Sequence, residues 1–398
     1  MNDGALSHVR VLDLTQHLAG PFCTKLLGEY GAEVIKVERP GLGDVARRLG
    51  PFPGDRPNSE ASGRFVYLNA NKRSVTLNLK TASGQAILRE LVRWADLAIT
   101  SHPPRVLERL GLEHATLAKA NRRLATLSIT NFGLTGPYRD YRADHMVLCA
   151  LGGWAQYLGQ SDRPPLQAGL DLALQVGGLQ AASAAIGVYR LAQESGRPHS
   201  ADLSLMETVV HMLPASALRY AMTGVIETRG MYPFPSQGIL RCDDGYLGVN
   251  TLTENHWELM CQWMGLTDLL DDQRFAVATG RWEHTGELRK RAEASIAGKG
   301  KHELFHEGQS WRVATGLVST AEDILKSDQL RDRDYFARVD HPALGGVEQP
   351  GAPVRMTESP WRLRSPAPAL GEHNAEVYCG LMGLSPAELV TLREQGAI

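Results

Sequence analysis

The chain has 398 residues, and its 42 Lys and Arg against 44 Asp and Glu give a formal net charge of −2. This balance disfavours a dedicated nucleic-acid-binding protein, and the 43% hydrophobic and 22% charged residues exclude a largely disordered chain. No apolar run has the roughly 18 residues that a membrane span needs, no secretory signal is visible, and the five cysteines are scattered. We therefore expect a soluble cytoplasmic protein of two or three structural units, with no nucleic-acid or membrane partner.

Strand and helix signals alternate over the first 130 residues. Short apolar runs typical of strands lie at residues 9–14, 33–38, 74–79, 97–100 and 124–130. Between them, residues 19–32 and 83–95 carry apolar side chains at helical spacing. This alternation predicts βαβ units and a mainly parallel sheet, so the expected fold class is α/β. Ligands of such sheets usually bind at the carboxyl ends of the strands.

The middle of the chain predicts a long helix and then a change of architecture. Residues 174–192 are rich in Ala, Gly and Leu and nearly uncharged, which predicts a helix that is buried on most sides. One more strand is expected at residues 201–205, followed by a helix at 206–222. Residues 238–251 predict a β-hairpin with an Asp-Gly turn at Asp244–Gly245.

The C-terminal part predicts an extended connection followed by helices. Residues 341–372 are rich in Pro and Gly, which is typical of a long extended path. The closing helices include a capping pattern formed by Ser385 and Glu388.

Two polar clusters each allow two interpretations. Lys72 and Arg73 lie at a strand start, where they form either a solvated turn or a cradle for phosphate. Residues 139–145 end in Asp144 and His145, and form either an ordinary polar loop or a substrate-facing loop suited to proton transfer. The sequence contains neither the glycine-rich phosphate motifs nor metal-ligand spacings, so no metal site is expected.

Six segments form an ordered set of motifs along almost the whole chain. They begin with LDLTQHLAGPF and NANKRSVTLNLK, and together they span residues 12–44, 69–80, 108–112, 128–145, 194–205 and 367–377. This set resembles the family III CoA-transferases, the CaiB/BaiF superfamily of formyl-CoA transferase, carnitine CoA-transferase and α-methylacyl-CoA racemase. The resemblance implies a large Rossmann-like CoA-binding domain at 1–225, a small α+β domain at 226–335, and a C-terminal segment at 336–398 that returns to the large domain. It also implies that two chains interlock as a dimer.

The resemblance further implies where coenzyme A would bind. The implied contact residues are Gln16, His17, Leu18, Ala19, Arg39, Lys72, Arg73, Ser101, His102, Arg109 and Arg142. The cations among them suit the phosphates of the nucleotide, and the backbone near His17 would line the path of adenine and pantetheine. The family often has Asn-Phe where this chain has Ser101-His102. CoA and its esters are then substrates, and no cofactor is permanently bound.

The catalytic carboxylate is where this chain departs from the family. The family's transferases use an Asp that attacks the acyl-CoA thioester and is itself acylated, and the alignment through PLQAGLDLALQVGG places Leu174 at that position. Asp171 lies three residues earlier, about one helical turn away. The racemase branch pairs this Asp with a His whose position matches Asp144 here, with His145 one place later.

Four interpretations remain open from the sequence. The chain is a non-catalytic subunit beside an Asp-bearing paralogue, as in heteromeric transferases that move CoA from succinyl-CoA to benzylsuccinate. Alternatively, Asp171 shifts into the site and a homodimer is active, Asp144 and His145 perform isomerase chemistry, or the chain binds CoA esters without catalysis. The accepting acid is unspecified, and analogy favours an aromatic or dicarboxylic acid. Tyr232, Phe234 and Trp257 are either walls of its pocket or core residues.

Overall fold

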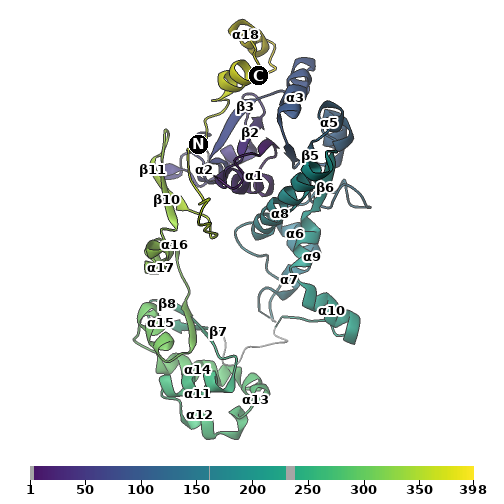
Figure 1. Cartoon of the computed structure of the whole chain (residues 1–398). Coiled ribbons are helices and arrows are strands. Elements are labelled where there is room, and N and C mark those ends of the chain that lie inside the picture. The colour runs from purple at the N-terminus through teal and green to yellow at the C-terminus, as the bar shows by residue number, and fades with distance from the viewer. Residues whose placement is uncertain (1–3, 161, 230–237) are drawn as a thin grey trace. The chain divides into compact units, whose positions relative to one another are not determined.

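The computed structural model describes residues 4–160, 162–229 and 238–398, with the exception of the Pro214 side chain. These residues divide into two compact units (Figure 1). Of the described residues, 4–159, 164–226 and 334–398 form the larger unit, and 160, 162–163, 227–229 and 238–333 form the smaller unit.

The larger unit is built on a six-stranded parallel sheet with the strand order β3-β2-β1-β4-β5-β6. The strands are β1 (Arg10–Leu14), β2 (Glu33–Glu38), β3 (Lys72–Thr76), β4 (Leu97–Thr100), β5 (Ala125–Thr130) and β6 (His199–Ser204). All neighbouring strands pair in parallel, which confirms the predicted α/β fold class. The central strands are short apolar runs because helices cover both faces of the sheet.

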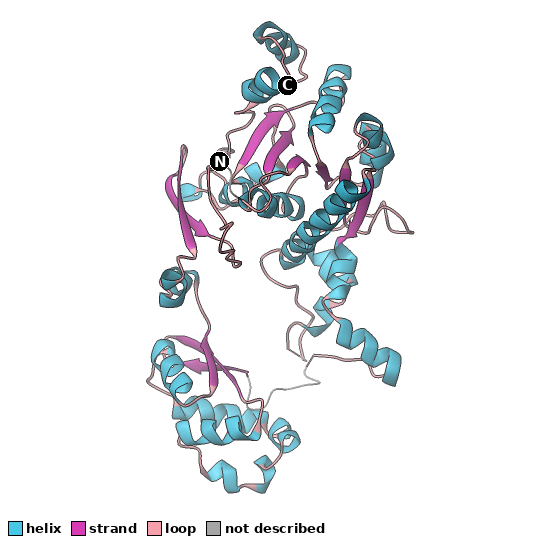
Figure 2. Ribbon diagram, viewed as in Figure 1, coloured by secondary structure: helices cyan, strands magenta, loops and turns pink. Residues whose placement is uncertain are grey.

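Helices form a layer on each side of this sheet (Figure 2). The helices of the larger unit are α1 (Ala19–Glu29), α2 (Gly63–Asn69), α3 (Ala82–Trp94), α4 (Pro104–Leu110), α5 (His114–Ala120), α6 (His145–Leu151), α7 (Trp154–Tyr157), α8 (Leu172–Ser195), α9 (Leu205–His211), α10 (Pro214–Thr223), a π-helix (Glu376–Leu381) and α18 (Pro386–Glu394). Val11 and Val34 face the core shared with α1 and α8. Leu12 and Ile35, one position later on each strand, face the core shared with α3, the π-helix and α18.

Helix α8 is exposed along one side, so the expectation of a helix buried on most sides is wrong. Leu179, Ile186 and Leu191 are each about half exposed, whereas the opposite face packs its small residues on α1 and α9. Among the described residues, α8 is the one helix whose length and hydropathy would suit a membrane span, and the core helix of a soluble protein passes the same test.

The contact between α8 and α1 depends on a missing side chain at Gly178. A Cβ atom there would lie 2.6 Å from the backbone oxygen of Ala19, which cannot rotate away. We expect Gly178→Ala to lower the free energy of unfolding by about 1–3 kcal/mol, as overpacking does. Gly187→Ala on the exposed side of α8, where nothing lies within 4 Å, is the matched control and should raise it by about 0.5–1 kcal/mol. Urea denaturation measures both, and equal effects would contradict the close approach.

The smaller unit contains an antiparallel sheet with the order β7-β8-β9, packed on helices. Its elements are β7 (Gly238–Cys242), β8 (Gly245–Asn250), α11 (Glu254–Trp263), α12 (Asp268–Asp271), α13 (Ala278–Glu283), α14 (Thr285–Ser295), α15 (Lys301–Ser310), β9 (Ala314–Leu317), α16 (Ala321–Leu325) and α17 (Asp328–Asp332). The predicted hairpin is confirmed, but its turn lies at Asp243–Asp244 because Gly245 already pairs with Cys242. Trp257 is 3% exposed within this unit's core. Tyr232 and Phe234 lie outside the described residues.

The C-terminal segment returns along the outer edge of β3. It starts with an antiparallel pair, β10 (Phe336–His341) and β11 (Gly345–Pro350), and continues without regular structure to the π-helix. Asn71 accepts hydrogen bonds from the backbone of Arg364 and Ser365, and Asn374 bonds to both the backbone and the side chain of Thr76. The Ser385–Glu388 capping box is confirmed at the start of α18.

Candidate active site

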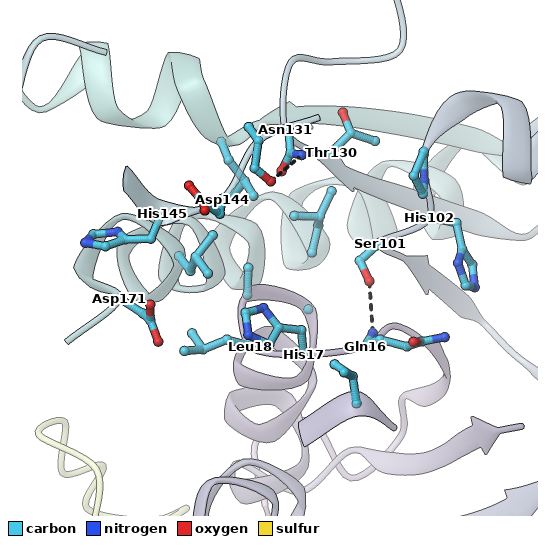
Figure 3. A pocket seen from close by; sticks show the side chains of 18 of the residues that line it. Gln16, His17, Leu18, Ser101, His102, Thr130, Asn131, Asp144, His145 and Asp171 are labelled. Carbon is cyan, nitrogen blue, oxygen red and sulfur yellow. Dashed lines mark hydrogen bonds between the residues drawn. The ribbon is translucent and has the colours of Figure 1, made fainter. Parts of the chain in front are cut away.

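A cavity of about 630 Å³ lies in the larger unit at the carboxyl ends of β1, β4 and β5. β1 and β4 are neighbours at the point where the chain order of the sheet reverses, which is where α/β sheets bind ligands. Gln16 follows β1 and Ser101 follows β4, and the Gln16 N–H donates to the Ser101 hydroxyl at 2.9 Å across this crevice (Figure 3). The starts of α6 and α8 complete the cavity wall.

The loop after β1 forms one wall of the cavity. His17 adopts a left-handed backbone with φ 73°, and its N–H donates to Asp44 Oδ1 at 2.9 Å. Burial, together with the charge of Arg64, lowers the pKa of His17 below its ordinary value, although Asp171 and Asp44 oppose this shift. The imidazole is therefore a neutral hydrogen-bonding group near pH 7.

Six of the predicted contact residues line the cavity. They are Gln16, His17, Leu18, Ala19, Ser101 and His102. Burial, with the nearby Lys36 ammonium, lowers the pKa of His102 as well, so this part of the wall is polar and uncharged near pH 7. Thr130, Asn131 and Gln167 add further neutral polar groups to the lining.

Lys72 does not reach the cavity, contrary to the phosphate contact predicted for it. Its ammonium is bonded to Asp13 Oδ2, Thr24 Oγ1, Asn69 Oδ1 and the Pro21 carbonyl, at 2.7–3.1 Å. The residue is 2% exposed, and a phosphate would have to displace these bonds to reach it. Lys72 is therefore a structural cation beneath the cavity. This role could not be predicted from the sequence, because Asp13 is 59 residues away from Lys72.

The other predicted cations also lie outside the cavity lining. Arg73 forms ion pairs with Glu33 and Glu376, which join β3 to β2 and to the π-helix. Arg39, Arg109 and Arg142 are exposed on the surface. The arginine that lines the cavity is Arg139, which sequence reasoning placed only in a general polar cluster. Its guanidinium pairs with Glu108 at 2.8 Å.

Asp144 and His145 both line the cavity, and both also hold backbone groups at helix starts. Asp144 Oδ1 accepts the Val147 N–H at 3.1 Å at the start of α6. His145 Nε2 lies 2.6 Å from the Ala168 carbonyl, to which it must donate, and Nδ1 accepts the Ala173 N–H at 3.4 Å. Both ring nitrogens are thus engaged with the backbone at the start of α8, and neither is free to exchange a proton with a ligand.

Asp171 and Leu174 lie in the same cavity, at the start of α8. Asp171 has a left-handed backbone, and its Oδ2 pairs with Arg64 Nη1 at 2.8 Å. Leu174 is 6% exposed and places a hydrocarbon side chain in the cavity lining one turn later. Arg64 was not found from the sequence, because nothing in α2 marks it as the partner of a residue 107 positions away.

Comparison with known proteins identifies the family. The sequence model of CoA-transferase family III matches residues 6–374. The chain belongs to CoA-transferase family III. It is 32% identical over 400 residues to succinyl-CoA–D-citramalate CoA-transferase of Chloroflexus aurantiacus, covering 99% of this chain and 98% of that protein. It is 31% identical over 407 residues to succinyl-CoA:(R)-benzylsuccinate CoA-transferase subunit BbsE of Thauera aromatica, covering 98% of each.

Solved structures of family III proteins share the fold. The crystal structure of a CAIB/BAIF family protein from Brucella suis superposes with a TM-score of 0.86 at 27% sequence identity, covering 95% of this chain and 100% of that one. CoA-transferases use CoA esters as substrates, so the cavity at the reversal of the strand order is the candidate site for a CoA ester.

Proposed function

We propose that this chain is the non-nucleophilic subunit of a heteromeric family III CoA-transferase. It would bind a CoA ester beside an Asp-bearing paralogue that supplies the nucleophile. The observation that carries the proposal is the Leu174 side chain in the cavity lining. A hydrocarbon cannot form the acyl anhydride through which a carboxylate nucleophile transfers CoA.

The relatives support the choice of substrates and of a second subunit. Their names specify succinyl-CoA with D-citramalate, succinate with glutarate, and succinyl-CoA with (R)-benzylsuccinate. We therefore propose succinyl-CoA as the CoA donor and a dicarboxylic acid as the acceptor. The benzylsuccinate relative is named as a subunit, which favours a hetero-oligomer over a homodimer.

The cavity offers a consistent set of contacts for a CoA ester. The neutral groups of Gln16, His17 and Asn131 would hydrogen-bond the thioester and pantetheine portion. Arg139 would meet a phosphate, because guanidinium groups bind phosphate oxygens with paired donors. These assignments concern binding and orientation, and the acyl-transfer step itself belongs to the partner's carboxylate.

One observation favours a second candidate function. Asp171 already lines the cavity, so no change of register is needed for it to meet a ligand. As a nucleophile, Asp171 would make a homodimer of this chain an active CoA-transferase. Its ion pair with Arg64 counts against this role, because an arginine-bound carboxylate oxygen is a weaker nucleophile. The isomerase alternative would need Asp144 and His145, which line the cavity, to exchange the backbone hydrogen bonds they make for contacts with the ligand.

The deciding experiment is a CoA-exchange assay with succinyl-CoA and a panel of dicarboxylic and aromatic acids. The purified chain is assayed alone and then mixed with an Asp-bearing family III paralogue from the same genome. We expect no turnover alone and turnover in the mixture. Turnover by the chain alone would overturn the proposal in favour of Asp171. CoA-ester binding without turnover in any mixture would instead indicate a non-enzymatic binder.

A further inference from the structure

The cavity wall depends on a backbone conformation that its own residue type disfavours. His17 has φ 73°, in the left-handed region that non-glycine residues rarely adopt without support from their surroundings. His17 and its neighbours Gln16 and Leu18 line the cavity, so any relaxation of this residue would change the shape of the wall.

A buried ion pair supports this conformation from below. Lys36 on β2 and Asp44 are both 0% exposed, and their charged groups lie 2.7 Å apart. Asp44 Oδ1 accepts the His17 N–H at 2.9 Å, and Lys36 Nζ donates to the Thr15 carbonyl at 3.0 Å. The two ends of the ion pair therefore hold the peptide groups on either side of Gln16.

Further hydrogen bonds restrain the backbone of the same loop after β1. The Gln16 N–H belongs to the same peptide unit as the Thr15 carbonyl, and it is bound by Ser101 at 2.9 Å. Asp13 Oδ1 accepts both the N–H and the hydroxyl of Thr15. Replacing a buried ion pair by apolar residues often leaves the stability of a protein unchanged. Apolar residues at positions 36 and 44 would, however, offer these peptide groups no hydrogen-bond partner.

We propose that Asp44 is a positioning residue of the ligand cavity, which uses its ion pair with Lys36 to hold His17 in the left-handed conformation. Asp44 is fully buried and is not part of the cavity lining, so it acts on the ligand through the loop after β1. It also accepts the Ala46 N–H at 2.8 Å and so holds the turn that begins at Val45, a second lining residue. The conformational role stands on the contacts above, whereas the identity of the ligand rests on the proposed function.

The test combines Asp44→Asn with two substitutions at position 17 in the full chain. Glycine tolerates a positive φ and alanine does not, so the double variants separate positioning from general stability. Amide exchange at Gln16 reports the conformation of the loop, since Gln16 is bonded to Ser101 and not to Asp44. CoA itself is the binding probe, measured by calorimetry.

We expect Asp44→Asn to speed exchange at Gln16 and to weaken CoA binding, each by about tenfold or more. Adding His17→Gly should restore the slow exchange at Gln16, and adding His17→Ala should not. Both double variants lack the imidazole that the proposed function places against the ligand, so CoA binding is compared between these two and should be tighter in the glycine variant. Unchanged exchange in a folded Asp44→Asn variant, or equal behaviour of the two double variants, would overturn the proposal. If the unaltered chain does not bind CoA, the proposed function fails while the exchange measurement still decides the role of Asp44.

A second series leaves the ion pair intact in case Asp44→Asn does not fold. His17→Asn tolerates the left-handed region, whereas His17→Val is strongly disfavoured there. We expect faster exchange at Gln16 in His17→Val only. Equal exchange in both variants would show that the loop does not depend on this conformation and would overturn the proposal.

Discussion

Asp13→Asn is expected to lower the free energy of unfolding of the larger unit by about 3–5 kcal/mol, because it leaves buried charges without their partner. Asp13 is 0% exposed, and its Oδ2 lies 3.1 Å from Lys72 Nζ and 3.9 Å from Lys36 Nζ. Burial alone would raise the pKa of the Asp13 carboxyl, but the two ammonium groups and the hydroxyls of Thr15 and Thr24 hold it well below its ordinary value. Burial lowers the pKa of Lys72 to about 8 even with Asp13 present.

Urea denaturation at neutral pH measures this effect, and Glu194→Gln is the control. Glu194 pairs with Arg190 on the exposed end of α8, so its replacement should leave stability unchanged. The dependence of stability on pH in the acidic range gives a second test. Because the pKa of Asp13 is depressed in the folded state, its contribution is present above the ordinary value of 3.8 and is lost as the pH falls below it. The variant should lack this component, and a loss of stability similar to that of the control would contradict the prediction.

Asp171→Ala is expected to leave the two-subunit transferase active. Replacing the catalytic aspartate of the paralogue by Ala should instead lower the rate of turnover by on the order of 1000-fold or more. The reason is that the proposed function gives the nucleophile's position in this chain to Leu174, and that Asp171 is held by Arg64. The measurement is the steady-state rate of CoA exchange at saturating succinyl-CoA, with CoA affinity determined separately.

Leu174→Ala is the control that changes the same cavity without touching a carboxylate. It removes buried hydrocarbon, so we expect a loss of stability of about 2–5 kcal/mol with turnover retained wherever the complex remains folded. A large loss of rate in Asp171→Ala at unchanged CoA affinity would make Asp171 the nucleophile and would contradict the assignment of this chain as the non-nucleophilic subunit.

The sheet could be predicted from the sequence because its evidence is local. Runs such as residues 9–14 and 124–130 are rich in buried apolar side chains, as strands covered on both faces usually are, and the alternation with helices implies the parallel order. The exposed side of α8 was missed for a related reason. Its Ala, Gly and Leu residues are apolar on every side, so composition does not reveal which side meets the core.

The electrostatics of the site could not be predicted because they depend on distant partners. Lys72 was predicted to face a phosphate, but its charge is neutralised by Asp13 from another strand. His145 was predicted as a proton carrier, and its ring instead joins α6 to the start of α8. Gln16 and Ser101, which the motifs predicted as ligand contacts, both line the cavity, since the carboxyl ends of neighbouring parallel strands converge there.

Because the segment that covers the outer edge of β3 is C-terminal, this edge is covered late during translation. The Thr76 N–H can donate its hydrogen bond to Asn374 only after a further 298 residues have been synthesised. At roughly 5–20 residues per second, the outer edge of β3 stays uncovered for about 15–60 s on the ribosome. An uncovered strand edge can pair with another chain, so nascent copies of this protein are exposed to mispairing until translation is nearly finished.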